Sequence, residues 1–199
     1  MKRLAVLVSG SGSNMQSIID STKKGILKGL AEVVLVISSN SNAYATKRAK
    51  NENIKVVCIE IKNFKDEKSF NTEILKELKN VKADIICLAG YIRIVGQEII
   101  GNYNNRILNI HPSLLPKFGG KGMYGHYVHE AVVRSRETKS GATVHFIDEN
   151  YDTGKIITQQ EVEVLKDDTP QDVAKRVLIV ECQIYPKAIK EVIENLNKI

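Results

Sequence analysis

The chain has 199 residues, of which 43% are hydrophobic and 26% are charged, with a formal net charge of +6. This length and composition favour one globular domain, 1–199, with a sizeable core. No apolar run is long enough to cross a bilayer, and Leu4–Val8 is too short for a signal peptide. Lysines and arginines are scattered and form no Arg-rich tract among aromatics, so we expect neither a membrane nor a nucleic-acid partner.

The cysteines exclude two further classes of protein. Cys58, Cys87 and Cys182 are odd in number, lie far apart and form no C-x-x-C pair. The pattern therefore predicts neither a disulfide framework nor a zinc site. Unpaired thiols suit a reducing compartment, and we expect the protein to be cytoplasmic.

The first two thirds of the chain alternate between apolar strands and helical patterns. Continuous apolar runs of this kind, separated by helices, are typical of a parallel sheet that is covered on both faces. Right-handed crossovers then favour a doubly wound order such as 3-2-1-4-5. In chain order we expect strands at 4–8, 31–38, 55–61, 83–90 and 106–110, with helices from the glycine-rich turn to Gly25 and at 44–53, 66–79 and 96–103.

The last third has a different pattern. Residues 141–148 and 155–164 are predicted as paired strands, and the alternation of the second favours an antiparallel addition at the sheet edge. Thr169 and Pro170 form a good start for a helix that runs to Leu196. Pro186 is expected to kink this helix or divide it into two.

The stretch VSGSGSNMQSII, 8–19, places glycines between the first strand and the first helix. A dinucleotide fingerprint would need glycine where Met15 stands, and the second strand ends without an acidic residue. A P-loop would need G-K-[ST]. The turn therefore predicts a loop for one phosphate at Gly12, Ser13 and Asn14. The alternative is an ordinary helix cap.

The fifth strand ends in Asn109-Ile110-His111-Pro112. Pro112 stops the strand, and the two-residue period points Asn109 and His111 to one side. Asp152, in the turn between the last two strands, can complete an amide, imidazole and carboxylate set, in which we expect the carboxylate to raise the pKa of His111. Because no Ser or Cys stands in a nucleophile motif, the set suits direct acyl transfer. The alternative is that His111 only caps the strand.

The other histidines give weaker signals. His126 and His129 are spaced i, i+3 on a predicted helix, but without a third ligand we expect a solvated face rather than a metal site. His145 either supports the site from behind or lies in the core. Tyr91 and Phe118 either line a pocket or pack.

Five segments, SGSGSN, LAGYIRIV, NIHPSLLP, GATVHFIDENYDTG and ECQIYP, together resemble the phosphoribosylglycinamide formyltransferase family in order over nearly the whole chain. The resemblance implies transfer of a formyl group from 10-formyltetrahydrofolate to the amine of 5-phosphoribosylglycinamide in purine synthesis. It implies small-molecule substrates, no tightly bound cofactor or metal, and a monomer or homodimer.

The resemblance also implies roles for individual residues. Glu181 would contact the ribonucleotide, whose phosphate Gly12, Ser13 and Asn14 would hold. The catalytic set would be Asn109, His111 and Asp152. The folate site would be formed by Ile92, Arg93, Ile94, Val95 and Asn109.

The sequence departs from the family in one place and leaves rival functions open. The family often has a basic residue before the third helix, where Glu67 stands here, so that Lys65 or Lys68 would have to substitute. Residues 117–126 predict a Gly-rich mobile flap. The rivals are a formyltetrahydrofolate hydrolase and a non-catalytic nucleotide-binding module, while a transfer RNA formyltransferase and a nicotinamide oxidoreductase are disfavoured.

Overall fold

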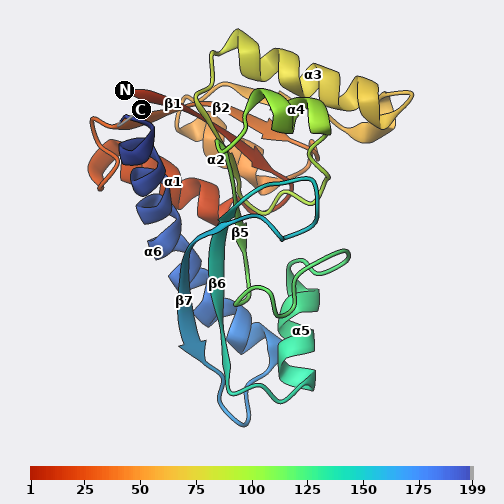
Figure 1. The fold of residues 1–199 in the computed structure, drawn as a ribbon, viewed down its shortest axis with the longest axis vertical. Coiled ribbons are helices and arrows are strands. Elements are labelled where there is room, and N and C mark those ends of the chain that lie inside the picture. The colour runs from red at the N-terminus through yellow and green to blue at the C-terminus, as the bar shows by residue number, and fades with distance from the viewer. Residues whose placement is uncertain (198–199) are drawn as a thin grey trace.

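The computed structural model describes residues 1–197 and contains a seven-stranded sheet with the order β3-β2-β1-β4-β5-β6-β7 (Figure 1). The first five strands pair in parallel, while β5–β6 and β6–β7 are antiparallel, as expected from the sequence. The single-domain prediction for 1–199 stays a prediction, and residues 198 and 199 lie outside the described part. The strands are β1 (Lys2–Val8), β2 (Ala31–Ser38), β3 (Val56–Cys58), β4 (Ile85–Leu88), β5 (Ile107–His111), β6 (Lys139–Phe146) and β7 (Ile156–Glu163).

Helices cover both faces of the sheet, because alternate residues of the central strands are buried on opposite sides. Leu4 and Val6 of β1 belong to one core cluster, with residues of α1, α2, α5 and α6, while Ala5 and Leu7 belong to the other, with α3 and α4. The helices are α1 (Ser13–Lys24), α2 (Tyr44–Asn51), α3 (Glu67–Asn80), α4 (Gln97–Asn102), α5 (His126–Arg134) and α6 (Pro170–Leu196), with a 3-10 turn η1 (Ile61–Asn63).

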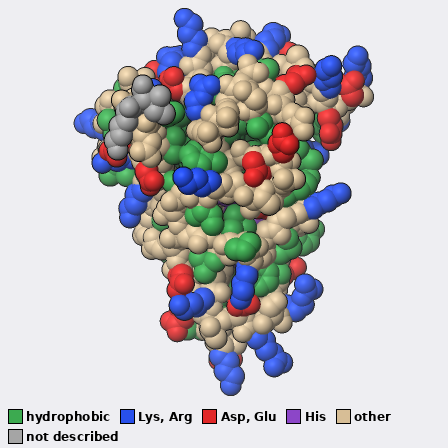
Figure 2. All heavy atoms as spheres, viewed as in Figure 1, with side chains coloured by type: hydrophobic (Ala, Val, Ile, Leu, Met, Phe, Trp, Pro, Cys, Tyr) green, Lys and Arg blue, Asp and Glu red, His purple; other side chains and the backbone are tan. Residues whose placement is uncertain are grey.

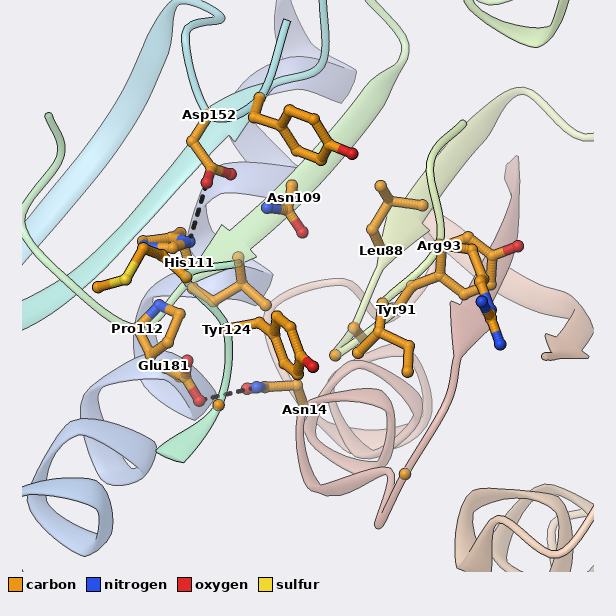
Figure 3. A pocket seen from close by; sticks show the side chains of 18 of the residues that line it. Asn14, Leu88, Tyr91, Arg93, Asn109, His111, Pro112, Tyr124, Asp152 and Glu181 are labelled. Atoms are coloured by element: carbon orange, nitrogen blue, oxygen red, sulfur yellow. Dashed lines mark hydrogen bonds and ion pairs between the residues drawn. The ribbon is translucent and has the colours of Figure 1, made fainter. Parts of the chain in front are cut away.

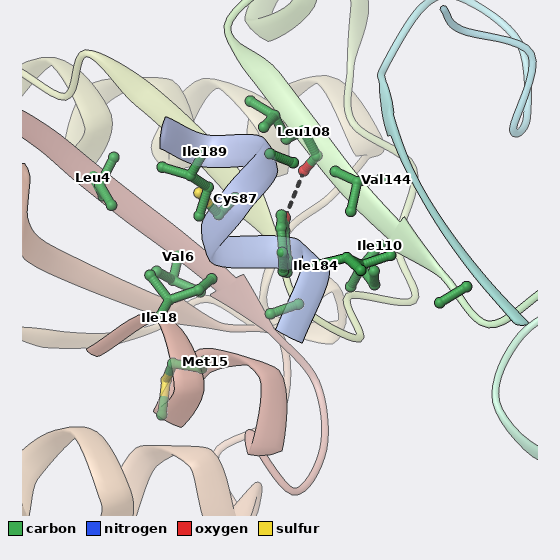
Figure 4. Close-up of a cluster of buried hydrophobic side chains, with 14 of the residues drawn as sticks. Leu4, Val6, Met15, Ile18, Cys87, Leu108, Ile110, Val144, Ile184 and Ile189 are labelled. Carbon is green, nitrogen blue, oxygen red and sulfur yellow. Dashed lines mark hydrogen bonds between the residues drawn. The ribbon is translucent and has the colours of Figure 1, made fainter. Parts of the chain in front are cut away.

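The last helix, α6, is continuous, so the expectation that Pro186 divides it is wrong. It begins with a capping box between Thr169 and Asp172. Around Pro186 the helix is buried against the sheet, where the Tyr185 hydroxyl lies 3.0 Å from the carbonyl oxygens of both Leu88 and Leu108. Tertiary packing of this kind outweighs the loss of one N–H donor. Figure 4 shows the side chains of this helix among those of β4, β5 and β6.

The sheet order brings the predicted polar residues to one edge. The carboxyl ends of β1, β4 and β5 open on the same side, as parallel strands require. The antiparallel register of β5 and β6 places His145 opposite Asn109 and Thr143 opposite His111. The end of β5 and the paired part of β6 thus bring four polar side chains together.

Candidate active site

A cavity of about 530 Å³ lies at this edge of the sheet. Its walls come from the loop after β1, the segment after β4, the end of β5, the β6–β7 turn, the 117–126 flap and α6. Figure 2 shows hydrophobic side chains around a hollow near the middle of this face, and Figure 3 shows the polar residues inside it. The residues predicted for the phosphate loop, the catalytic set and the folate segment, and Glu181, all line this one cavity.

The glycine-rich loop gives α1 no side-chain cap. Gly12 is the N-cap of α1, with a left-handed φ of 76°, and no side chain caps the helix. The backbone N–H groups of Gly12, Ser13 and Asn14 have no acceptor within residues 1–197. Free N–H groups and the positive end of the helix dipole can together bind a phosphate. The alternative of a simple Ser or Asn cap is therefore wrong.

Glu181 lies beside this loop on α6, and only 8% of its surface is exposed. The Asn14 amide nitrogen donates to a Glu181 carboxylate oxygen at 2.9 Å (Figure 3). Burial raises the pKa of Glu181 to about 7, although the bond from Asn14 lowers it. A carboxyl of this kind can accept or donate a hydrogen bond to a ligand near neutral pH.

His111, at the end of β5, is 3% exposed and has a defined orientation. Its Nε2 lies 2.8 Å from the carbonyl oxygen of Phe118. A carbonyl only accepts, so Nε2 carries the proton and Nδ1 of the neutral ring is free to take another. Nδ1 lies 3.5 Å from a carboxylate oxygen of Asp152.

The pKa of His111 is lowered, not raised as the sequence led us to expect. Burial disfavours the charged ring and outweighs the opposing effects of Asp152 and of the Phe118 carbonyl. The carboxylate raises the pKa as anticipated, but the sequence could not reveal how deeply β5 is buried. A neutral imidazole near pH 7 is the form that can accept a proton.

Asp152 is held on the β6–β7 turn by the flap, and the rings of His111 and His145 lie beside it. Its backbone has a φ of 54°, and one carboxylate oxygen accepts from the Gly120 N–H at 2.9 Å. The other oxygen lies 3.6 Å from Nε2 of His145. Burial raises the pKa of Asp152, but the contacts with His145, His111 and Gly120 outweigh it and keep that pKa below its usual value. The group is therefore a carboxylate at neutral pH.

Asn109 is oriented by His145, which is fully buried. The Nδ1 of His145 donates to the Phe146 carbonyl at 2.8 Å, so its Nε2 accepts from the Asn109 amide nitrogen at 3.2 Å. One N–H of Asn109 is used in this way, and its second N–H stays available to a ligand. His145 is thus both buried in the core and hydrogen-bonded to Asn109 from behind.

The segment after β4 forms the apolar side of the cavity. Ile92 and Ile94 are exposed at its mouth, whereas Val95 packs in the core. The Ile92 N–H donates to the Ser9 hydroxyl at 3.1 Å, which ties this segment to the end of β1. Arg93 is the only Lys or Arg among the residues that line the cavity in the described chain.

The segment in which this sequence differs from the family lies outside the cavity. Glu67, Lys65 and Lys68, at the start of α3, are absent from its lining within residues 1–197. The lining therefore gives no support to Lys65 or Lys68 as a substitute for the missing basic residue. Tyr91 lines the cavity, whereas Phe118 packs against the core and serves the site only through its carbonyl.

The expectation of a solvated face on α5 is wrong for one residue. His129 is 6% exposed, its Nδ1 has no hydrogen-bond partner in the described chain, and burial lowers its pKa to about 4. His126 and His129 both line the cavity. No group of three metal-binding side chains occurs within residues 1–197.

A family model described as Formyl transferase matches residues 2–189. The chain belongs to the formyl transferase family. It is 40% identical over 193 residues to the chloroplastic phosphoribosylglycinamide formyltransferase of Vigna unguiculata, covering 97% of this chain and 61% of that protein. It is also 40% identical over 188 residues to the trifunctional purine biosynthetic protein adenosine-3 of Bos taurus, covering 94% of this chain and 18% of that one. The chain thus spans less than two thirds of these two relatives.

Solved structures agree with the family. The glycinamide ribonucleotide transformylase 1 of Symbiobacterium toebii matches with a TM-score of 0.92 at 36% identity, over 98% of this chain and 89% of that one. The phosphoribosylglycinamide formyltransferase of Brucella melitensis matches with a TM-score of 0.88 at 36% identity, over 96% and 95%. The predicted doubly wound sheet is confirmed by these structures and by the strand order.

Two contacts of this candidate site had no signal in the sequence. The Phe118 carbonyl and the Gly120 N–H, both in the flap, hold His111 and Asp152. Backbone groups carry no sequence signature, and the only local hint was the glycine-rich composition of 117–126. The expected mobility of this flap stays a prediction.

Proposed function

We propose that the protein transfers a formyl group from 10-formyltetrahydrofolate to the amine of 5-phosphoribosylglycinamide. The observation that carries the proposal is that one cavity of about 530 Å³ contains a loop of free N–H groups, an apolar segment and the Asn109, His111 and Asp152 set. A phosphorylated substrate and a folate can therefore meet at the polar set. The names of these relatives support phosphoribosylglycinamide as the acceptor of the formyl group, and the resemblance to the family implies 10-formyltetrahydrofolate as its donor.

The chemistry requires one bond to form and one to break. The substrate amine attacks the formyl carbon, a carbon–nitrogen bond forms, and the carbonyl oxygen becomes an oxyanion. The available N–H of Asn109 is placed to stabilise that oxyanion. When the intermediate collapses, the bond to the folate nitrogen breaks and that nitrogen gains a proton.

His111, assisted by Asp152, carries out the proton transfers. Nδ1 of the neutral His111 ring accepts the proton of the attacking amine, directly or through water, and returns one to the departing folate nitrogen. Asp152, 3.5 Å from Nδ1, stabilises the ring while it is charged. The route needs no nucleophilic side chain and no tightly bound cofactor.

The two substrates occupy opposite arms of the cavity in this proposal. Gly12, Ser13 and Asn14 hold the ribose phosphate, and Glu181 accepts a hydrogen bond from the ribonucleotide. Ile92 to Val95 hold the folate ring system through main-chain groups and apolar contact. Arg93, the one Lys or Arg of the lining within residues 1–197, binds a folate carboxylate in this proposal.

Compartment and assembly are part of the proposal. No helix within residues 1–197 is both long and apolar enough to cross a membrane. We place the protein in the cytoplasm because its three cysteines are unpaired thiols. We expect a monomer or a homodimer, with small-molecule substrates alone as its partners.

Steady-state assays with and without the amine substrate test the proposal. We expect product only when 5-phosphoribosylglycinamide and 10-formyltetrahydrofolate are both present. Equal folate turnover without the amine would instead establish a hydrolase, and phosphate binding without any turnover would establish a non-catalytic module. His111→Ala serves as the inactive control, with an expected rate loss of about 100- to 10,000-fold.

A further inference from the structure

Arg48 lies on α2, directly behind the glycine-rich loop and outside the cavity lining. Its Nε donates to the carbonyl oxygen of Ser11 at 3.0 Å, and its guanidinium carbon lies 5.0 Å from the centre of the Tyr44 ring. Within residues 1–197 no carboxylate forms an ion pair with it. The positive charge of Arg48 is therefore held against the loop and is not neutralised by an acidic partner.

Two carbonyl groups of the loop face α2. The Ala45 N–H donates to the Gly10 oxygen at 3.1 Å, and Arg48 donates to the Ser11 oxygen. In a trans peptide, the carbonyl and the next N–H point in opposite directions. The one cis peptide bond of residues 1–197 lies elsewhere. The N–H groups of Ser11 and Gly12 therefore point away from α2, and both residues line the cavity.

The loop itself supplies no cationic side chain. A phosphate monoester carries a charge of about −1.5 to −2 at pH 7, and N–H dipoles only partly offset it. Arg93 is the only Lys or Arg in the cavity lining of the described chain, and Figure 3 places it away from His111, beyond Tyr91. Within residues 1–197, Arg48 is the one Lys or Arg whose side chain donates a hydrogen bond to the loop backbone. By donating to the Ser11 carbonyl, it also polarises the peptide that carries the Gly12 N–H.

We propose that Arg48 is a positioning residue for the substrate phosphate. It holds the Ser11 peptide so that the Gly12 N–H faces the phosphate, and it places a positive charge behind that N–H. The inference rests on the proposed function, since it requires the ribonucleotide phosphate to lie in this loop. Arg48 touches neither the formyl carbon nor the folate, so its loss weakens ribonucleotide binding and leaves the chemical step intact.

Kinetics of three variants test the proposal. Arg48→Ala is expected to raise the KM for 5-phosphoribosylglycinamide about 10- to 100-fold, the range for a lost hydrogen bond from a charged group. The kcat and the KM for 10-formyltetrahydrofolate stay near their wild-type values. Arg48→Lys recovers most of the loss, because it keeps a charge and a donor. Lys47→Ala is the control, since Lys47 lies 6.0 Å from the Tyr44 ring without a bond to the loop.

The same experiment distinguishes a failure of the role proposed for Arg48 from a failure of the proposed function. An unchanged ribonucleotide KM in Arg48→Ala, while Asn14→Ala raises it, overturns the role of Arg48 and leaves the proposed function standing. A fall in kcat together with a rise in both KM values would show that the substitution loosens the whole fold, and this result would also overturn the positioning role of Arg48. If the wild type transfers no formyl group, the proposed function fails and this inference with it. Arg48→Gln, which keeps a donor without the charge, is expected to lie between the Lys and Ala variants and replaces Arg48→Ala if that variant does not fold.

Discussion

The buried carboxyl of Glu181 predicts a measurable cost to stability at neutral pH. Burial on α6 raises its pKa to about 7, from 4.5 for a free side chain, despite the bond from Asn14. Between these two values the folded protein binds more protons than the unfolded chain. The free energy of unfolding contributed by this group is therefore greatest below pH 4.5 and decreases as the pH rises to about 7.

The magnitude follows from the two pKa values. At about 1.4 kcal/mol for each pKa unit, the difference between about 7 and 4.5 corresponds to about 3 kcal/mol. Glutamine has the shape and hydrogen-bonding groups of a protonated glutamic acid and never ionises. Glu181→Gln is therefore expected to make the ligand-free protein more stable by up to about 3 kcal/mol at pH 8, with no gain below pH 4.5.

Urea unfolding at several pH values between 4 and 8 measures this difference. Glu191→Gln is the matched control, because Glu191 is exposed on the same helix. Equal stability of wild type and Glu181→Gln at pH 8, or a gain that is constant across the range, would refute the reasoning. The stabilised variant is also expected to show a raised KM for the ribonucleotide, since the proposed contact loses its charge.

Three further variants test separate parts of the site. In urea unfolding, Gly12→Ala is expected to destabilise the fold by about 1–3 kcal/mol more than Gly29→Ala. Both glycines have φ near 76°, but a new Cβ at Gly12 would lie 2.7 Å from the Ala45 side chain of α2, whereas a Cβ at Gly29 would contact nothing. Equal losses of stability in the two variants would contradict the close packing at Gly12. Asp152→Asn is expected to lower the pKa of His111 further, as measured by NMR titration, and to reduce kcat by about 100-fold. An unchanged pKa of His111 in this variant would show that Asp152 does not influence the imidazole. Arg93→Ala is expected to raise the KM for 10-formyltetrahydrofolate about tenfold and leave that for the ribonucleotide unchanged; the reverse pattern would move Arg93 to the other substrate.

The sheet was predictable because its strands are continuous apolar runs separated by clear helical patterns. Residues 31–38 were predicted as a strand and form β2 with those bounds, and the helix predicted at 66–79 is α3 (Glu67–Asn80). Pro186 misled the prediction, since a local rule cannot weigh the packing of α6 against the sheet. Long segments with a clear hydrophobic period thus predict their own secondary structure, whereas a single helix-breaking residue does not predict where a helix ends.

The polar set was predictable from strand ends, whereas its electrostatics were not. Parallel topology brings Asn109, His111 and the loop of Gly12 to one edge, and turn position adds Asp152. The lowered pKa of His111 and the burial of His129 depend on which elements pack above them, and no sequence spacing records that. Contacts made by flap backbone are equally invisible before folding.

The most direct test of the account follows a formyl group labelled with ¹³C through a single turnover by NMR. We expect the label to pass from 10-formyltetrahydrofolate to the amine nitrogen of 5-phosphoribosylglycinamide, with no labelled formate when the amine substrate is absent. Asn109→Ala is expected to slow this step by about 100- to 1,000-fold, as for a lost oxyanion donor. Labelled formate released at the same rate with or without the amine, or a wild-type rate in Asn109→Ala, would contradict it.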